Sequence, residues 1–212
     1  MICLPVMIIS VSFNIAMRSS ATYDYNFSST EILSKMTVSI DQKELADLFG
    51  DYMKHRTDTF QLKQNVEYNP QDVFSEKDQA YMHNIRKITD IVAMAGIPAT
   101  VVTVFAYWLL IRWRRREVIR SFFIRGAWIF VVMTAVLSLC KFITPLYKVI
   151  IEPVKGTGVE AGDALITIFG AGFHRTELMF ELIISLIFFG VMAYITHEVA
   201  GRKKIFSGFG GY

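Results

Sequence analysis

The chain carries few charges for its length. Lys and Arg number 22 and Asp and Glu 19 in 212 residues, so 19% of the residues are charged and 53% are apolar. A soluble domain usually has about 25% charged residues. Four stretches contain no Asp, Glu, Lys or Arg at all, namely residues 1–17, 91–111, 126–140 and 182–196. This distribution excludes a wholly soluble protein and a disordered one, and it indicates a membrane protein.

Cysteine is also scarce. Cys3 and Cys140 are the only two cysteines, and both fall in apolar stretches, which excludes a disulfide framework for the polar segments. The spacings of a metal site are missing, as are the phosphate-binding, dinucleotide-binding, nucleophile-elbow and HExxH motifs. We therefore expect no metal and no cofactor.

The apolar stretches predict an all-α membrane protein with four spans, because about 20 apolar residues cross a hydrocarbon core about 30 Å thick. The predicted spans are residues 1–17, 91–111, 122–144 and 177–197, separated by segments 18–90, 112–121 and 145–176 and followed by a tail at 198–212. A cleaved signal peptide is the alternative for the first stretch. That stretch has no basic start and exceeds a typical signal-peptide core, so a retained span is favoured.

Basic residues predict the orientation of the protein in the cell membrane. Residues 112–120 contain five arginines, and the tail begins Arg-Lys-Lys at 202–204. Loops rich in Lys and Arg stay in the cytoplasm, so both termini are expected there, with segments 18–90 and 145–176 on the outer face. An arginine run also suits nucleic acid or lipid headgroups. We interpret it as a topology signal and expect no nucleic-acid partner.

Segment 18–90 has the balanced charge of a soluble domain and contains two helix starts. Residues 41–44 (Asp-Gln-Lys-Glu) and 75–78 (Ser-Glu-Lys-Asp) match the capping-box pattern. The first is followed by apolar residues on one helix face up to residue 53, and the second leads into the second span without a Gly or Pro until residue 96. We therefore predict a small α-helical cap between spans 1 and 2. Segment 145–176 is broken up by Pro and Gly, which favours a re-entrant or interfacial element.

Histidine is the side chain best suited to act as a base near neutral pH. His83 and His174 are expected near the outer membrane surface, whereas His55 is expected at a helix end, where a cation is favourable. His197 is expected at the inner interface. Glu181 lies one turn inside the fourth span, where a carboxylate normally faces the bundle interior. For His83 and His174, a satisfied interfacial side chain without a catalytic role is the favoured interpretation.

The order of several short motifs resembles a family of four-span bacterial integral membrane proteins that includes the lipoprotein intramolecular transacylase. The motifs are residues 23–27 (YDYNF), 74–78 (FSEKD), 81–85 (YMHNI), 142–147 (FITPLY) and 163–169 (DALITIF). The resemblance implies a helical bundle with an extracytoplasmic cap and a site at the outer leaflet. It also implies transfer of an acyl chain from the diacylglyceryl group of a lipoprotein's N-terminal cysteine to the α-amino group of that cysteine. Such a reaction needs a base and oxyanion donors.

The chain departs from the family pattern at the positions of the family's proton-handling residues. Tyr81 stands at the first histidine position, Asn84 at the accompanying aspartate position and Tyr147 at the second histidine position. A phenol with a pKa of about 10 is a poor base at neutral pH. His83 lies about 200° round a helix from Tyr81 and does not replace it.

Two functions follow from this departure. The first is a non-catalytic membrane protein that binds lipid, a lipoprotein or another membrane subunit at the outer leaflet. The second is an active acyltransferase with a changed site, whose candidate residues are Tyr81, Tyr147, His83, His174, Glu177 and Glu181. A transporter subunit is a third hypothesis, and it has only the intramembrane carboxylate of Glu181 in its favour.

Overall fold

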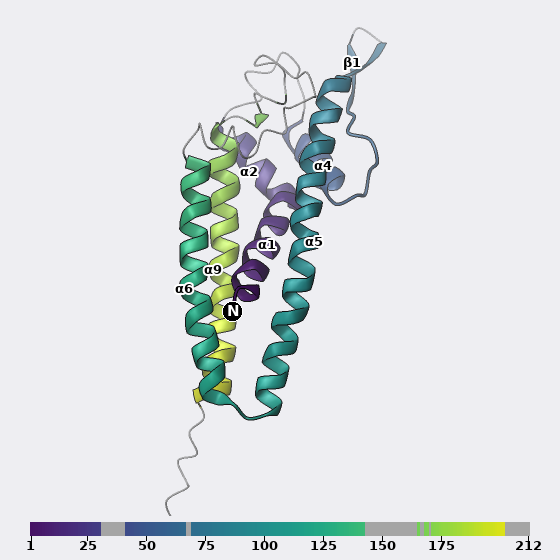
Figure 1. Cartoon of the computed structure of the whole chain (residues 1–212). Helices are drawn as coiled ribbons and strands as arrows, with labels where there is room; N and C mark the ends of the chain where they lie inside the picture. The colour runs from purple at the N-terminus through teal and green to yellow at the C-terminus, as the bar shows by residue number, and fades with distance from the viewer. Residues whose placement is uncertain (31–40, 67–68, 143–164, 166–167, 170, 202–212) are drawn as a thin grey trace, which may run out of the picture.

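The structure, a computed structural model, describes residues 1–30, 41–66, 69–142, 165, 168–169 and 171–201. Three long helices, α5 (Glu76–Arg112), α6 (Arg116–Phe142) and α9 (Ala171–Gly201), form a bundle around α1 (Cys3–Arg18) (Figure 1). A smaller group at one end of the bundle, termed the head, comprises α2 (Ser20–Thr30), α4 (Gln42–Met53) and strands β1 (Lys63–Val66) and β2 (Asn69–Asp72). The predicted helical bundle is therefore present.

Three helices of the described part are long and apolar enough to cross a membrane: Glu76–Arg112, Arg116–Cys140 and Phe173–Ala200. A fourth span is obtained only if α1 and α2, which are bent by 65° relative to each other, count as one broken span. Helix α1 alone has 16 residues and is about 24 Å long, shorter than the hydrocarbon core. The prediction of a helical membrane protein is confirmed, with three or four spans.

Helix α5 begins in the head and continues through the apolar stretch 91–111. Its first turn is closed by a capping box, in which the backbone N–H of Asp78 donates to Ser75 Oγ (3.3 Å) and the backbone N–H of Ser75 donates to Asp78 Oδ2 (3.0 Å). The predicted helix start at Ser75 is confirmed. With 37 residues, α5 is about 55 Å long and exceeds the hydrocarbon thickness, so its first turns lie outside the apolar stretch.

Small residues bring α1 close to α5. Ser10 Oγ donates a hydrogen bond to the carbonyl of Val92, and a Cβ added at Gly96 would lie 2.8 Å from Ser10 Cβ. Such small residues allow membrane helices to approach closely. Below this contact, Leu4 and Ile8 are buried in a cluster that also contains Ala99 and Phe130 of the neighbouring helices. Many other apolar side chains of α5, α6 and α9 are exposed, as on a lipid-facing surface.

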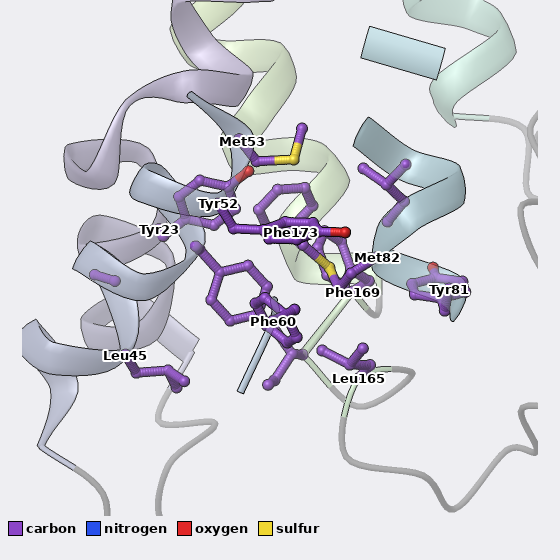
Figure 2. Close-up of a cluster of buried hydrophobic side chains, with 14 of the residues drawn as sticks. Tyr23, Leu45, Tyr52, Met53, Phe60, Tyr81, Met82, Leu165, Phe169 and Phe173 are labelled. Carbon is purple, nitrogen blue, oxygen red and sulfur yellow. The ribbon is translucent and has the colours of Figure 1, made fainter. Parts of the chain in front are cut away.

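The head encloses an aromatic core (Figure 2). Helix α4 starts at Asp41, whose carboxylate accepts from the backbone N–H of Glu44 (3.3 Å), as the capping pattern predicts. The predicted apolar face of α4 is buried, and the ring of Phe49 lies 4.9 Å from that of Phe60 and 5.0 Å from that of Tyr23. The largest fully buried aromatic side chains are Tyr23, Phe27, Phe49, Phe60, Phe74 and Phe173.

Two features differ from the sequence predictions. Strands β1 and β2 form an antiparallel hairpin with Lys63 opposite Asp72, in a chain predicted to be entirely α-helical. Residues 63–72 are mostly polar and show no alternation, so the usual strand signal is missing. Helix α6 begins at Arg116, earlier than the predicted 122, because hydropathy marks only the apolar part of a helix. Most of segment 145–176 lies outside the described residues.

The head and the arginine-rich turn lie at opposite ends of the bundle, and the turn lies beside the last residues of α9 (Figure 1). Residues 113–115 connect α5 to α6, with Arg114 at a φ of 54°. Arg112, Arg116 and Arg120 are exposed at this end. The N-terminus lies partway along the bundle. The side of the membrane on which each end lies stays a prediction.

Candidate functional site

Tyr81 is packed into the wall of the aromatic core of the head (Figure 2). Its side chain is only 4% exposed, and its ring meets that of Phe169 edge-on at 5.7 Å. Burial raises the pKa of Tyr81 to about 12, because an apolar environment disfavours the phenolate. The Tyr81 hydroxyl has no hydrogen-bond partner among the described residues. Tyr81 is therefore a neutral phenol at neutral pH and is not activated as a base.

The second candidate from the transacylase-like motifs, His83, does not share the environment of Tyr81. His83 is exposed, whereas Tyr81 and Met82 beside it are buried. This agrees with the predicted angular separation of Tyr81 and His83 on one helix. Tyr147 lies outside the described residues.

His174, Glu177 and Glu181 lie in the first turns of α9. His174 is half-buried and meets the ring of Phe173 edge-on at 5.8 Å. Glu181 is 6% exposed, which confirms the prediction that it faces the interior, and Glu177 is 3% exposed. Burial, and to a lesser degree the nearby Glu177 carboxylate, raise the pKa of Tyr23 in α2. The first turns of α9 thus contain two buried carboxylates, and one of them, Glu177, lies near Tyr23 of the head.

The predicted candidates Tyr81, His83 and His174 lie in different surroundings, the first buried, the second exposed and the third half-buried. From Tyr81, ring contacts lead to Phe169, on to Phe173 at 4.5 Å and only then to His174. The ring contacts that link Tyr81 to His174 thus pass through Phe169 and Phe173. Among the described residues, the surroundings of Tyr81 consist mainly of packed aromatic and aliphatic side chains.

A different polar cluster lies where the head meets the apolar stretch of α5. Asp90 accepts a hydrogen bond from Arg18 Nη2 at 2.7 Å, and its two carboxylate oxygens lie 3.0 and 3.1 Å from His55 Nε2. The side chains of Arg18, His55 and Asp90 are 28%, 48% and 32% exposed. Three separate elements, the end of α1, the turn after α4 and the middle of α5, thus meet at one carboxylate.

The backbone around His55 explains how its imidazole reaches this position. His55 has a φ of 58°, its N–H donates to the carbonyl of Tyr52, and the N–H of Arg56 donates to the carbonyl of Asp51. These two bonds form a Schellman helix end, at which glycine usually occupies the left-handed position. A histidine at this position costs about 1–2 kcal/mol in backbone energy relative to a right-handed conformation. Sequence reasoning placed His55 at a helix end but did not recognise its contact with Asp90.

A groove of about 680 Å³ runs between α1 and α5 beside this cluster. Its walls are mainly apolar, with Val11 and Ile15 from α1 and Ile97 and Val101 from α5, whereas Arg18 and Lys54 line it near the head. This volume is in the range of sites that hold small organic ligands. The groove therefore combines a long apolar wall with cations at one end.

One sequence signal could have located the cluster. Arg18 is the first charge after the uncharged stretch 1–17, and Asp90 is the last charge before the uncharged stretch 91–111. If both stretches enter the membrane from the same face, their boundary charges lie at the same depth. That reasoning pairs Arg18 with Asp90 but does not reveal His55, whose position depends on the turn after α4.

Three helices long and apolar enough to cross a membrane, with a folded head at one end of the bundle, define an integral membrane protein. The chain belongs to the family of the lipoprotein intramolecular transacylase Lit, whose model matches residues 1–148. No curated protein sequence and no solved structure matches the chain. The matched range includes α1, the head, α5 and four of the five short motifs, so the resemblance is confirmed, and the motif at 163–169 lies outside that range.

Proposed function

We propose that this protein is a non-catalytic member of the transacylase family that binds membrane lipid or lipoprotein acyl chains at the outer leaflet. The observation that carries the proposal is the packing of Tyr81 against Phe169 at a family histidine position. A buried neutral phenol does not remove a proton from an amine at neutral pH. Loss of a general base costs about 10²–10⁴ in rate, while the helical scaffold and its apolar groove remain available for binding.

The proposal includes an orientation. The exposed arginines at residues 112–120 lie at the end of the bundle opposite the head. On the positive-inside rule this end faces the cytoplasm, which puts the head and the Arg18–Asp90–His55 cluster at the outer face. A partner subunit is not required by this proposal.

An active acyltransferase is the second candidate, and the contact between His55 and Asp90 favours it. A carboxylate that holds one imidazole nitrogen leaves the other available as a base, and His55 Nδ1 has no partner among the described residues. In this reaction the α-amino nitrogen attacks the ester carbonyl, the new N–C bond forms and the ester C–O bond breaks. The proton of the amine passes through the imidazole to the leaving glyceryl oxygen.

Mass spectrometry of lipoprotein N-termini separates the two candidates. The gene is expressed in a bacterial host that makes only diacylglyceryl lipoproteins, with an active transacylase of the family as the positive control. We expect no lyso-form lipoprotein with an N-acyl and an S-monoacylglyceryl group. If that product forms and is lost in His55→Ala but kept in Tyr81→Phe, the acyltransferase is established and the non-catalytic proposal is wrong.

Lipid that copurifies with the protein tests the binding part of the proposal. We expect the protein extracted in a mild detergent to retain phospholipid or lipoprotein through size-exclusion chromatography, detected by mass spectrometry of the organic extract. A purified, folded protein that retains neither contradicts the proposed function.

A further inference from the structure

The groove between α1 and α5 is lined differently along its length. Arg18, at the end of α1, and Lys54, after α4, lie at the head end of the groove, where α5 enters its apolar stretch. Ile97 and Val101, farther along α5, are 64% and 62% exposed. The groove thus opens toward the surrounding lipid along its apolar part and is flanked by cations at the boundary of that part.

The charge balance at the head end is positive. Asp90 is paired with Arg18 at 2.7 Å, whereas Lys54 has no ion-pair partner among the described residues. Lys54 therefore adds a positive charge that no carboxylate in the described part neutralises. An unpaired ammonium beside a membrane surface attracts the phosphate of an anionic lipid by about 1 kcal/mol.

We propose that this groove binds one acyl chain of an anionic phospholipid, with the lipid phosphate against Lys54 and Arg18. The inference rests on the proposed lipid-binding function and names the lipid and its place. A phospholipid fits better than the diacylglyceryl group of a lipoprotein, because only the phospholipid carries a phosphate opposite the two cations. The close approach of Ser10 to Gly96 and the hydrogen bond from Ser10 Oγ to the Val92 carbonyl hold α1 against α5, and the groove runs beside this contact.

Native mass spectrometry of the full-length protein in detergent measures this binding, with dipalmitoyl phosphatidylglycerol and dipalmitoyl phosphatidylcholine as the two added lipids. We expect wild-type protein to bind phosphatidylglycerol about fivefold more tightly than phosphatidylcholine. Lys54→Gln should weaken phosphatidylglycerol binding about fivefold and phosphatidylcholine binding less, because the choline ammonium offsets the phosphate charge. The matched control is Lys43→Gln, an exposed lysine at the opposite end of α4.

A second pair of variants tests the apolar wall. Val101→Trp fills the groove and should weaken the binding of both lipids about tenfold or more. Val102→Trp is the matched control, because Val102 is 52% exposed and lies on the opposite side of α5, about 180° from Ala93 in the groove. Thermal unfolding of each variant checks that the fold is kept.

The outcomes separate failure of the groove from failure of the proposed function. Equal binding of the two lipids by wild-type protein, or unchanged phosphatidylglycerol binding in both Lys54→Gln and Val101→Trp, overturns the groove proposal while lipid binding elsewhere keeps the proposed function. Equal weakening by Val102→Trp and Val101→Trp also overturns it. If wild-type protein binds neither lipid and copurifies with no lipoprotein, both proposals fail.

Discussion

Tyr81 and Asp90 lie on the same helix, α5, about 14 Å apart along its axis. Their surroundings differ in packing, charge and exposure. Around Tyr81 aromatic rings fill the space, and the side chain is 4% exposed. Beside Asp90, charged groups are about one-third exposed and border an open groove. The position of Tyr81 is thus part of a packed core, whereas the polar groups beside the open groove lie nearer the apolar stretch of α5.

The largest expected difference between the two regions is in stability. Phe49 is fully buried and contacts several rings of the head, among them Tyr23 and Phe60, so Phe49→Ala should lower the free energy of unfolding by about 3–5 kcal/mol. Val101→Ala in the groove should change it by less than about 0.5 kcal/mol, because that side chain is 62% exposed. Denaturation in detergent micelles, followed by circular dichroism, measures both. Similar losses in the free energy of unfolding for the two variants would contradict the inference that the head is tightly packed and the groove wall is not.

Alkaline pH should destabilise the head through Tyr81. The folded-state pKa is about 12 against an ordinary value of 10.0, so the stabilising contribution of the neutral phenol is complete below pH 10 and is lost as the pH rises through 12. Tyr81→Phe should match wild type at pH 7 and be more stable by about 2 kcal/mol at pH 12. Unfolding measured from pH 9 to 12 checks this, with Tyr25→Phe, an exposed tyrosine, as the control. An equal response of the two variants would show that Tyr81 ionises freely.

The contact between α1 and α5 should be sensitive to a single methyl group. A Cβ at Gly96 would lie 2.8 Å from Ser10 Cβ, whereas one at Gly190 would meet nothing within 4 Å. Gly96→Ala should therefore lower the free energy of unfolding by about 1–3 kcal/mol, and Gly190→Ala should leave it unchanged or raised slightly. The melting temperatures of the two variants in the same detergent provide the measurement. A Gly96→Ala protein as stable as Gly190→Ala would mean that α1 and α5 are not closely packed.

The smallest effect is expected at the charged cluster. Asp90→Asn removes the negative charge that Arg18 and His55 share, but because all three side chains are partly exposed the stability should fall by no more than about 1 kcal/mol. The difference from wild type should shrink as salt is added. Asp51→Asn, which breaks the more exposed pair with Arg56, should have a still smaller effect. Thermal unfolding at low and high salt compares them, and a loss as large as that of Phe49→Ala would show that the cluster is a structural core.

Features determined within a few residues could be predicted from the sequence. The helix starts at Asp41 and Ser75 depend on side chains three residues away, and both were predicted. The hairpin at residues 63–72 was missed because its polar residues lack alternation. The bend after α1 was missed as well: Ser19 has extended backbone angles, and nothing in its local sequence distinguishes a bend from a continuing helix.

The site was predicted only in part, for a physical reason. Tyr81 is expected to be a neutral phenol at neutral pH because the ordinary pKa of a phenol is about 10. Burial raises the pKa of Tyr81 further. The burial of Glu181 follows from the cost of exposing a carboxylate to lipid. By contrast, the contacts of Asp90 join residues 35 and 72 positions away. Periodicity describes one helix at a time, so it does not show which residues of three separate elements meet.

The unbroken course of α5 from the head into the apolar stretch has a mechanical consequence. Residues 91–111 span about 31 Å, close to the thickness of an average hydrocarbon core. A helix in a thinner bilayer tilts to bury its apolar length, and in a thicker one it stands more upright. Because α5 carries part of the head at its own end, each change of tilt also reorients the head. A change in bilayer thickness should therefore change the orientation of the head relative to the membrane plane, independently of lipid binding in the groove.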